Sequence, residues 1–523
     1  MKHKLLVLLT AATCMVSCSK DFLEKPDPNA PTLETYYTNA AQVEGATGLL
    51  YGAAWQPFMD RAWLSIGDIM GGTGITSGPG DYAPYMNFTV SENDAQVMKA
   101  WKSFYKVAGV STILINAFEQ KKAKIGDQEF LNKGIAEARF MRAVAYFYLT
   151  RVFKDVPIIT DPVALAAGSD FNVPRHKQAD VLRFIIEDLK AAESGLPLIT
   201  SIPRKRVNAY SAKGMMAKVY LYMKDYANAK EKAWEVIKSG QYKLYPDYYQ
   251  LFSTAAANGN EESLFAFQWI ENGDWSSANH VQTNIGPGAL LDPLGAGGYS
   301  SVVPSINLLT AFERGDLRRR SVMEHGFHRT DWVNNNFPTG FTYDTLTTDN
   351  SKRSYTATRT NTAKYIVGPG DGVTKVIGVS NNMCTYVLRY ADVLLIYAEA
   401  VLGDNASTSD ATALDAFNEV RKRAGFTERK TSITKDMILH ERMIEFNFEG
   451  EFWFDVQRQG FAKAKEILEN QERGEYVTNN GVRTINHADV KGYFTSESQL
   501  FLPVPAAEIL LNPMLAQPSV NYY

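Results

Sequence analysis

The 523-residue sequence is poor in cysteine and has no excess of positive charge. Of its three cysteines, Cys14 and Cys18 lie in the N-terminal segment, so we expect no disulfide to form at Cys384 within the body of the chain. The formal net charge is −3, and no basic stripe could neutralise a row of phosphates. These features argue against nucleic-acid binding. Because no disulfide is expected, a large core alone must stabilise the body of the chain.

Several signatures of catalysis are also missing. The Gly-rich run at 71–80 lacks the Gly-Lys-Ser/Thr ending of a phosphate loop, and neither a GxSxG nor an HExxH motif occurs. His325 and His328 are spaced like a metal-binding pair, but Gly326 lies between them and no third ligand is evident. We therefore expect neither enzymatic activity nor a metal or cofactor, and we interpret the two histidines as part of a solvated loop.

The N-terminus has the composition of an export signal. Lys2 and Lys4 precede an apolar run at 5–16 that is too short to span a bilayer, and no later segment reaches that length without charges. Small residues directly before Cys18 are typical of the cleavage site of bacterial lipoproteins, in which the cysteine carries the lipid. A plain secretory signal with a free Cys18 is the alternative. Cleavage before Cys18 would change the net charge to −5, because both lysines leave.

The rest of the chain divides into regions of different composition. Pro26, Pro28 and Pro31 follow the cysteine closely and predict an extended spacer. We expect a signal peptide at 1–17, a lipidated tether at 18–40, a helical part at 41–250, a loop-rich ligand-binding insert at 251–385, and helix pairs with a tail at 386–523.

Helical periodicity dominates outside the insert. Apolar residues line two faces of 134–153, which predicts a helix packed between neighbours. Another helix is expected at 178–194, paired helices at 209–240 and 388–425, and a last helix at 434–449. The spacing in 209–240 is that of a tetratricopeptide unit, so we predict a mainly α fold with a stacked helical solenoid. Within the irregular insert, a small sheet is expected at 262–269 or 364–376.

Five separated stretches carry a resemblance to a known family. They are EARFMRAVAYFYLTRVFKDVPII (137–159), VPSINLLTAFERGDLR (303–318), LRYADVLLIYAEA (388–400), ERMIEFNFEGEFWFDVQRQG (441–460) and FLPVPAAEILLNPMLAQPSVNY (501–522). In composition, order and spacing they resemble the SusD/RagB family of surface lipoproteins from Bacteroidota.

The resemblance implies a tetratricopeptide flank and an irregular face that binds ligand. It also implies an outer-membrane lipoprotein, facing the cell exterior, that acts as a lid on a SusC-like TonB-dependent transporter. Ser19-Lys20-Asp21 after the cysteine resembles the short signal for surface export. The implied ligand is an oligosaccharide, and a RagB-like peptide-binding lid is the alternative. A surface glycosidase and a purely structural scaffold are further alternatives.

Loop aromatics are the candidates for contact with a sugar, because a flat ring can cover the apolar face of a pyranose while polar neighbours bind its hydroxyls. Each one alone is more often a packing residue than a ligand contact. The candidate ligand-binding residues are Asp81, Tyr82, Tyr85, Asn87, Trp269, Asn272, Trp275 and Tyr299, with Trp332 as a weaker addition.

Glu441, Glu445 and Glu449 recur every four residues and could suggest an acid–base pair on one helical stripe. A glycosidase pair normally lies across a cleft on separate elements, so we expect these carboxylates to form structural ion pairs instead. The expected cationic partners are Arg421, Arg423, Arg442 and Arg458.

Overall fold

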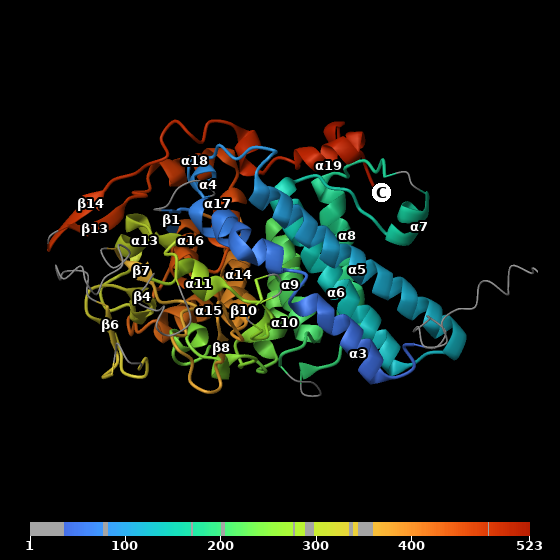
Figure 1. Cartoon of the computed structure of the whole chain (residues 1–523), viewed down its shortest axis with the longest axis horizontal. Helices are drawn as coiled ribbons and strands as arrows, with labels where there is room; N and C mark the ends of the chain where they lie inside the picture. Colours follow the sequence, from blue (N-terminus) through green and yellow to red (C-terminus); the bar gives the residue numbers. More distant parts are fainter. Residues whose placement is uncertain are drawn as a thin grey trace, which may run out of the picture.

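In the computed structural model, a row of helices lies beside a region of loops and short strands (Figure 1). The structure describes residues 36–76, 82–168, 171–199, 204–272, 274–275, 278–287, 298–333, 338–343, 359–479 and 481–523. Cys18, the signal segment and the proline spacer lie outside these ranges. Along the described part, no helix combines the length and apolar character needed to cross a membrane.

The longer helices pack on one another in chain order. Helices α5, α6, α8, α9 and α10 each contact the next one in this order, and α10 then contacts α14, which contacts α15. Their bounds, with those of α3 and α16, are α3 Ala40–Gly48, α5 Ala95–Ile125, α6 Glu129–Phe153, α8 Gln178–Gly195, α9 Ala209–Tyr222, α10 Tyr226–Lys238, α14 Tyr390–Leu402, α15 Ala411–Arg423 and α16 Lys435–Glu445. The predicted solenoid of helix pairs is thereby confirmed.

Local sequence explains where these helices begin and how closely they pack. Asn208 caps α9 by accepting hydrogen bonds from two backbone amides, and Ser211 bonds back to the Asn208 amide in a capping box. On α6, fully buried Ala138 and Ala145 present almost no side-chain bulk, so the neighbouring helices approach closely. The expected helix at 434–449 is shorter than predicted, because α16 ends at Glu445.

The remaining α-helices of the described residues are short. They are α4 Ala83–Met86, α7 Pro162–Gly168, α11 Val281–Ile285, α13 Ile306–Ala311, α17 Phe452–Gln457, α18 Phe461–Glu469 and α19 Ala506–Leu511.

The strands pair two by two, and all seven pairs within the described residues are antiparallel. The pairs are β1 Gly74–Thr76 with β3 Val302–Pro304, β2 Ser263–Phe267 with β10 Thr385–Arg389, β4 Val322–Met323 with β7 Asn361–Thr362, β5 Phe327–Arg329 with β6 Phe341–Tyr343, β8 Val376–Ile377 with β9 Ser380–Asn381, β11 Ser407–Thr408 with β12 Ile433–Thr434, and β13 Glu475–Asn479 with β14 Val482–Asn486. The strand expected at 262–269 is present, whereas the alternative at 364–376 is wrong, because only its last residue, Val376, lies in a strand.

Pairing of β2 with β10 joins the two ends of the irregular insert. Phe267 lies opposite Thr385 in this pair, and all five residues of each strand are buried. Because β10 leads directly into α14, the pair fixes the insert against the helical row. The loops within the insert are therefore held on a rigid base.

Candidate functional site

Two predicted aromatics, Trp275 and Tyr299, remain exposed close to the short buried helix α11. The side chain of Trp275 is 45% exposed, and its ring centroid lies 4.5 Å from that of His280, the residue that precedes α11. Gln56 donates a hydrogen bond to the Trp275 carbonyl at 2.8 Å. The indole thus packs against the His280 ring, while part of the Trp275 side chain remains open to solvent.

His280 is a buried support for this ring. Burial lowers the pKa of His280 from its usual value, against smaller opposing effects of the hydrogen bond to the Asp274 carbonyl and of the Asp60 charge, which favours the neutral imidazole at pH 7. One ring nitrogen lies 2.8 Å from the Asp274 carbonyl and the other 3.2 Å from the Gln56 amide nitrogen. A neutral, hydrogen-bonded ring under Trp275 holds the indole without adding charge.

Tyr299 is attached to the same helix by its backbone. Its side chain is 54% exposed, and its amide donates to the Thr283 carbonyl at 2.9 Å. The next residue, Ser300, has a φ of +46° and donates to the Gly286 carbonyl at 2.9 Å. Trp275 therefore packs on the residue before α11, and Tyr299 is hydrogen-bonded to a residue within α11, although 24 positions separate the two aromatics in the sequence.

The polar candidates are distributed differently. Asn272 is exposed near Trp275, and its side-chain oxygen accepts a hydrogen bond from the Asp274 amide at 3.0 Å. Asn87 is half-buried at the end of α4, in another part of the chain. Asp81 lies outside the described residues. Of the polar candidates that the structure describes, only Asn272 lies near Trp275. We call Trp275, Tyr299 and Asn272 the α11 site.

Four aromatic candidates are part of the core, which corrects the expectation that they face a ligand. Tyr85 is fully buried inside α4, and its hydroxyl donates to Asp94 at 2.7 Å. Trp269 is buried, and its indole nitrogen donates to Thr385 on β10 at 3.0 Å. Tyr82 and Trp332 are buried as well. Contacts between segments that are distant in the sequence cover these rings, and single-sequence reasoning could not foresee such contacts.

The carboxylates at 441–449 form buried ion pairs, as predicted. Glu441 contacts Arg421 at 3.0 Å, and Glu445 contacts Arg389 at 3.0 Å and also Arg423. Burial alone would raise the pKa of Glu445, but these arginines overcome it and hold that pKa far below its usual range. A buried, permanently ionised carboxylate cannot act as a general acid.

The predicted ion pairs of Arg442 and Arg458 with these glutamates are wrong. Arg442 pairs with Asp392 at 2.7 Å and Asp455 at 2.8 Å, because it points away from the glutamate stripe. Arg458 pairs with Glu399 and Asp455. Glu449 lies beyond the end of α16 and pairs with Lys364, which the sequence did not suggest.

A metal site finds no support in the structure. No cluster of three or more His, Cys, Asp or Glu side chains in the described ranges has a metal-binding arrangement. His328 lies on β5, where its Nδ1 is 2.7 Å from the Thr342 hydroxyl.

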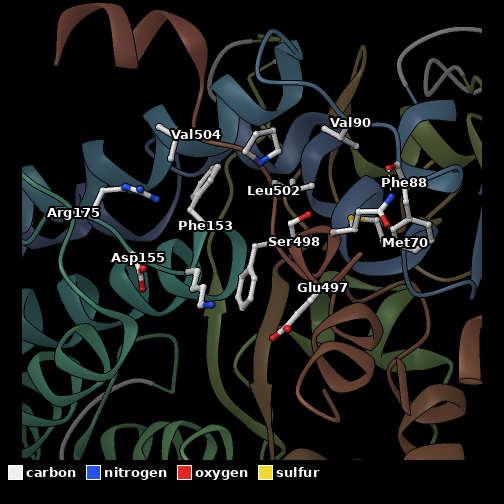
Figure 2. Close-up of a pocket in the computed structure, with 14 residues that line it drawn as sticks. Met70, Phe88, Val90, Phe153, Asp155, Arg175, Glu497, Ser498, Leu502 and Val504 are labelled. Atoms are coloured by element: carbon white, nitrogen blue, oxygen red, sulfur yellow. Dashed lines mark hydrogen bonds between the residues drawn. The ribbon is translucent and has the colours of Figure 1, made fainter. Parts of the chain in front are cut away.

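A cavity lies elsewhere on the molecule (Figure 2). It has a volume of about 620 Å³ and is lined by residues from the end of α6, from the turn after α4, and from 497–504. Sequence reasoning missed it, because its walls come from segments without a common motif. The exposed aromatics near α11 and this cavity are therefore two separate features.

The sequence is similar to known proteins along its whole length. The SusD family model matches residues 261–523, and a second model, described as starch-binding associating with outer membrane, matches residues 81–221. A SusD-like protein from Bacteroides ovatus is 32% identical, over 100% of this chain and 98% of the relative. This chain belongs to the SusD family.

Two further comparisons agree with this assignment. SusD-like protein P2 from Formosa agariphila is 25% identical over the full length of both chains. A solved structure with xylogluco-oligosaccharide is 30% identical and superimposes with a TM-score of 0.77, covering 92% of this chain and 99% of the other. The similarity in fold thus extends over both the helical row and the loop-rich region.

Proposed function

We propose that this SusD-family protein is a non-catalytic lipoprotein that binds an oligosaccharide at the α11 site and passes it to a SusC-like TonB-dependent transporter. The observation that carries the proposal is the exposed indole of Trp275, which lies on the buried His280 ring. The 30% identity to a structure with xylogluco-oligosaccharide supports a glycan as the ligand.

The chemistry of the site fits a sugar better than a reaction. An aromatic face covers the C–H groups of a pyranose ring, and the exposed Asn272 amide and Tyr299 hydroxyl provide hydrogen-bonding groups for its hydroxyls. The stripe carboxylates Glu441 and Glu445 are buried in ion pairs and unavailable for acid–base catalysis. Binding without cleavage is the function that these residues support.

Affinity electrophoresis in gels containing xyloglucan tests the glycan proposal. We expect the protein to be retarded, and Trp275→Ala and Tyr299→Ala to lose most of the retardation, because each loses its aromatic face. Trp234→Ala is the matched control, since Trp234 is 39% exposed but lies on α10, stacked on Tyr397. Retardation of Trp275→Ala equal to that of the parent protein would place the ligand elsewhere.

The same preparation separates the alternatives. Release of reducing ends by the pure protein would contradict the non-catalytic proposal. Failure with xyloglucan and every other glycan tested, together with retention of mixed oligopeptides, would favour a peptide-binding lid.

The lipid anchor at Cys18 and the association with a SusC-like transporter are tested in cells that make the protein. We expect Cys18→Ala to move from the membrane fraction to the soluble fraction, because a lipid anchor requires that thiol. Protease digestion of intact cells should remove the native protein if it faces the exterior. Purification after mild crosslinking should retain an outer-membrane transporter, and its absence would contradict the lid role.

A further inference from the structure

Another cavity, of about 510 Å³, lies between α5, α6, α7 and the segment that contains α19. In Figure 1, α7 and α19 lie on the same side of α5. The volume is within the range of pockets that bind small ligands. Apolar side chains make up most of the wall, among them Ile159, Leu165, Phe171, Val173, Leu511 and Leu515.

Much of this apolar wall is open to solvent. Phe171 is 49% exposed and Leu511 is 72% exposed. Ile159, Leu165 and Val173 are half-buried. A ligand in the cavity can therefore cover carbon atoms that now contact water, and the free energy gained is proportional to the apolar area covered.

The polar side chains in the wall are already hydrogen-bonded within the protein. The Tyr105 hydroxyl donates to the Pro157 carbonyl at 2.9 Å, and the Asn512 side-chain nitrogen donates to the Val173 carbonyl at 2.8 Å. The Tyr146 hydroxyl accepts a hydrogen bond from a backbone amide at 2.8 Å. A sugar or a peptide would bury polar groups here without new partners, which is unfavourable. The wall therefore favours a hydrocarbon ligand.

Gly109 leaves additional space where α5 lines the cavity. It lies in the interior of this 31-residue helix, where glycine is less favourable than alanine. A Cβ built on Gly109 would meet no atom within 4 Å, so close packing of a neighbouring element does not require glycine at this position. Its effect on the structure is to keep the hollow wide beside α5.

Two lysines and one glutamate are the charged residues of the wall. Lys102 and Lys106 are exposed, lie four residues apart on one face of α5, and form no ion pair within the described ranges. Like charges at this spacing repel each other. Glu508 is half-buried and offsets one of the two positive charges, so one remains in excess. An anionic group at the solvent side of the cavity is therefore favoured over a cationic one.

We propose that this cavity binds a fatty acid, a free single-chain amphiphile, with its alkyl chain along the apolar wall and its carboxylate in solvent beside Lys102 and Lys106. Walls from several elements around one hollow suit a single chain better than the flat surface of a bilayer. The proposed site shares no residue with the α11 site, so binding of a fatty acid is independent of glycan binding.

Calorimetric titration with dodecanoate, below its micelle concentration, tests this proposal. The full chain carries Cys18→Ala, because a lipidated protein requires detergent, which would compete for an apolar site. We expect one dodecanoate to bind per chain. Decanoate should bind about 10-fold more weakly, because each buried methylene contributes to affinity. Dodecyltrimethylammonium has the same chain with a positive charge, and it should bind about 3-fold more weakly than dodecanoate.

Gly109→Leu should weaken the binding of dodecanoate about 10-fold or more, because the new side chain fills the hollow. Leucine is also the better helix former, so the variant should fold. Gly45→Leu is the matched control, since Gly45 lies within α3, has no atom within 4 Å of a Cβ, and does not line the cavity. Leu511→Asp is a second variant, which places a negative charge on an exposed position of the wall and should also weaken binding.

Retardation by xyloglucan that matches the parent protein would show that Gly109→Leu is folded. Unchanged binding of dodecanoate by this folded variant would overturn the proposal, as would equal affinities for decanoate and dodecanoate. Sedimentation of the Cys18→Ala protein with phosphatidylglycerol vesicles, lost in Leu511→Asp, would overturn it in favour of a membrane surface as the partner.

Discussion

Arg318 connects the loop-rich insert to α16, and its removal should destabilise the protein strongly. The guanidinium is completely buried and contacts Asp316 at 2.8 Å, Glu441 at 2.6 Å and Glu445 at 3.1 Å. In Arg318→Met, the two glutamates keep other arginine partners, as described above. Asp316, in contrast, loses its only cationic partner among the described residues and stays buried.

The size of the expected loss of stability follows from Asp316, which is left without a cationic partner while Glu441 and Glu445 keep theirs. Breaking a buried ion pair by removing one partner costs about 3–5 kcal/mol, because a buried charge is left uncompensated. We expect Arg318→Met to lower the free energy of unfolding by about that amount. The adjacent Arg319 provides the control, since its side chain is 42% exposed and pairs with Glu324 at 2.7 Å. Arg319→Met should cost about 1 kcal/mol or less.

Urea denaturation followed by tryptophan fluorescence measures both variants under identical conditions. A lower midpoint for Arg318→Met with an unchanged slope would indicate lost stability of the native state. If Arg318→Met and Arg319→Met unfold at the same urea concentration, the buried network does not stabilise the insert, and our reasoning is refuted.

Two further predictions concern the buried junction around Asp68 and Gly450. A Cβ on Gly450 would lie 2.0 Å from the Trp63 indole nitrogen, so Gly450→Ala should reduce the yield of folded protein far more than Gly460→Ala, where φ is also positive but space is open. Similar melting temperatures would contradict this. Burial raises the pKa of Asp68 to about 6 from 3.8, so its stabilising contribution is present below pH 4 and is lost as pH rises through 6. The free energy of unfolding of the parent protein, relative to that of Asp68→Asn, should therefore fall by about 3 kcal/mol between pH 4 and pH 7. A difference in urea midpoints that does not change with pH would disprove this prediction.

Helical periodicity predicted much of the fold because it is a local property. The pair at 209–240 and the helix at 178–194 match α9, α10 and α8 closely. The longest described helix, α5, was not predicted, although Val97, Trp101 and Phe104 lie at helical spacing and are buried on one face. The periodic signal that marks the other helices is therefore present in that segment as well.

The candidate site was only partly predictable. Loop composition correctly pointed to Trp275 and Tyr299 as exposed rings, but it pointed equally to Tyr85 and Trp269, which are buried. The difference depends on hydrogen bonds to Asp94 and Thr385 and on the packing around them, and Thr385 lies 116 positions from Trp269. Composition within a loop contains no information about such distant contacts.

The sequence by itself determined the helical solenoid, because local periodicity encodes it. It also determined that the chain belongs to the SusD family, because the motifs of that family are present. It also indicated that the glutamates at 441–449 would form ion pairs. Only the tertiary structure decided which cations they meet, which aromatics face solvent, and that a cavity forms near the end of α6. Burial and charge pairing depend on which distant segments meet in space, and this becomes defined only when the chain is folded.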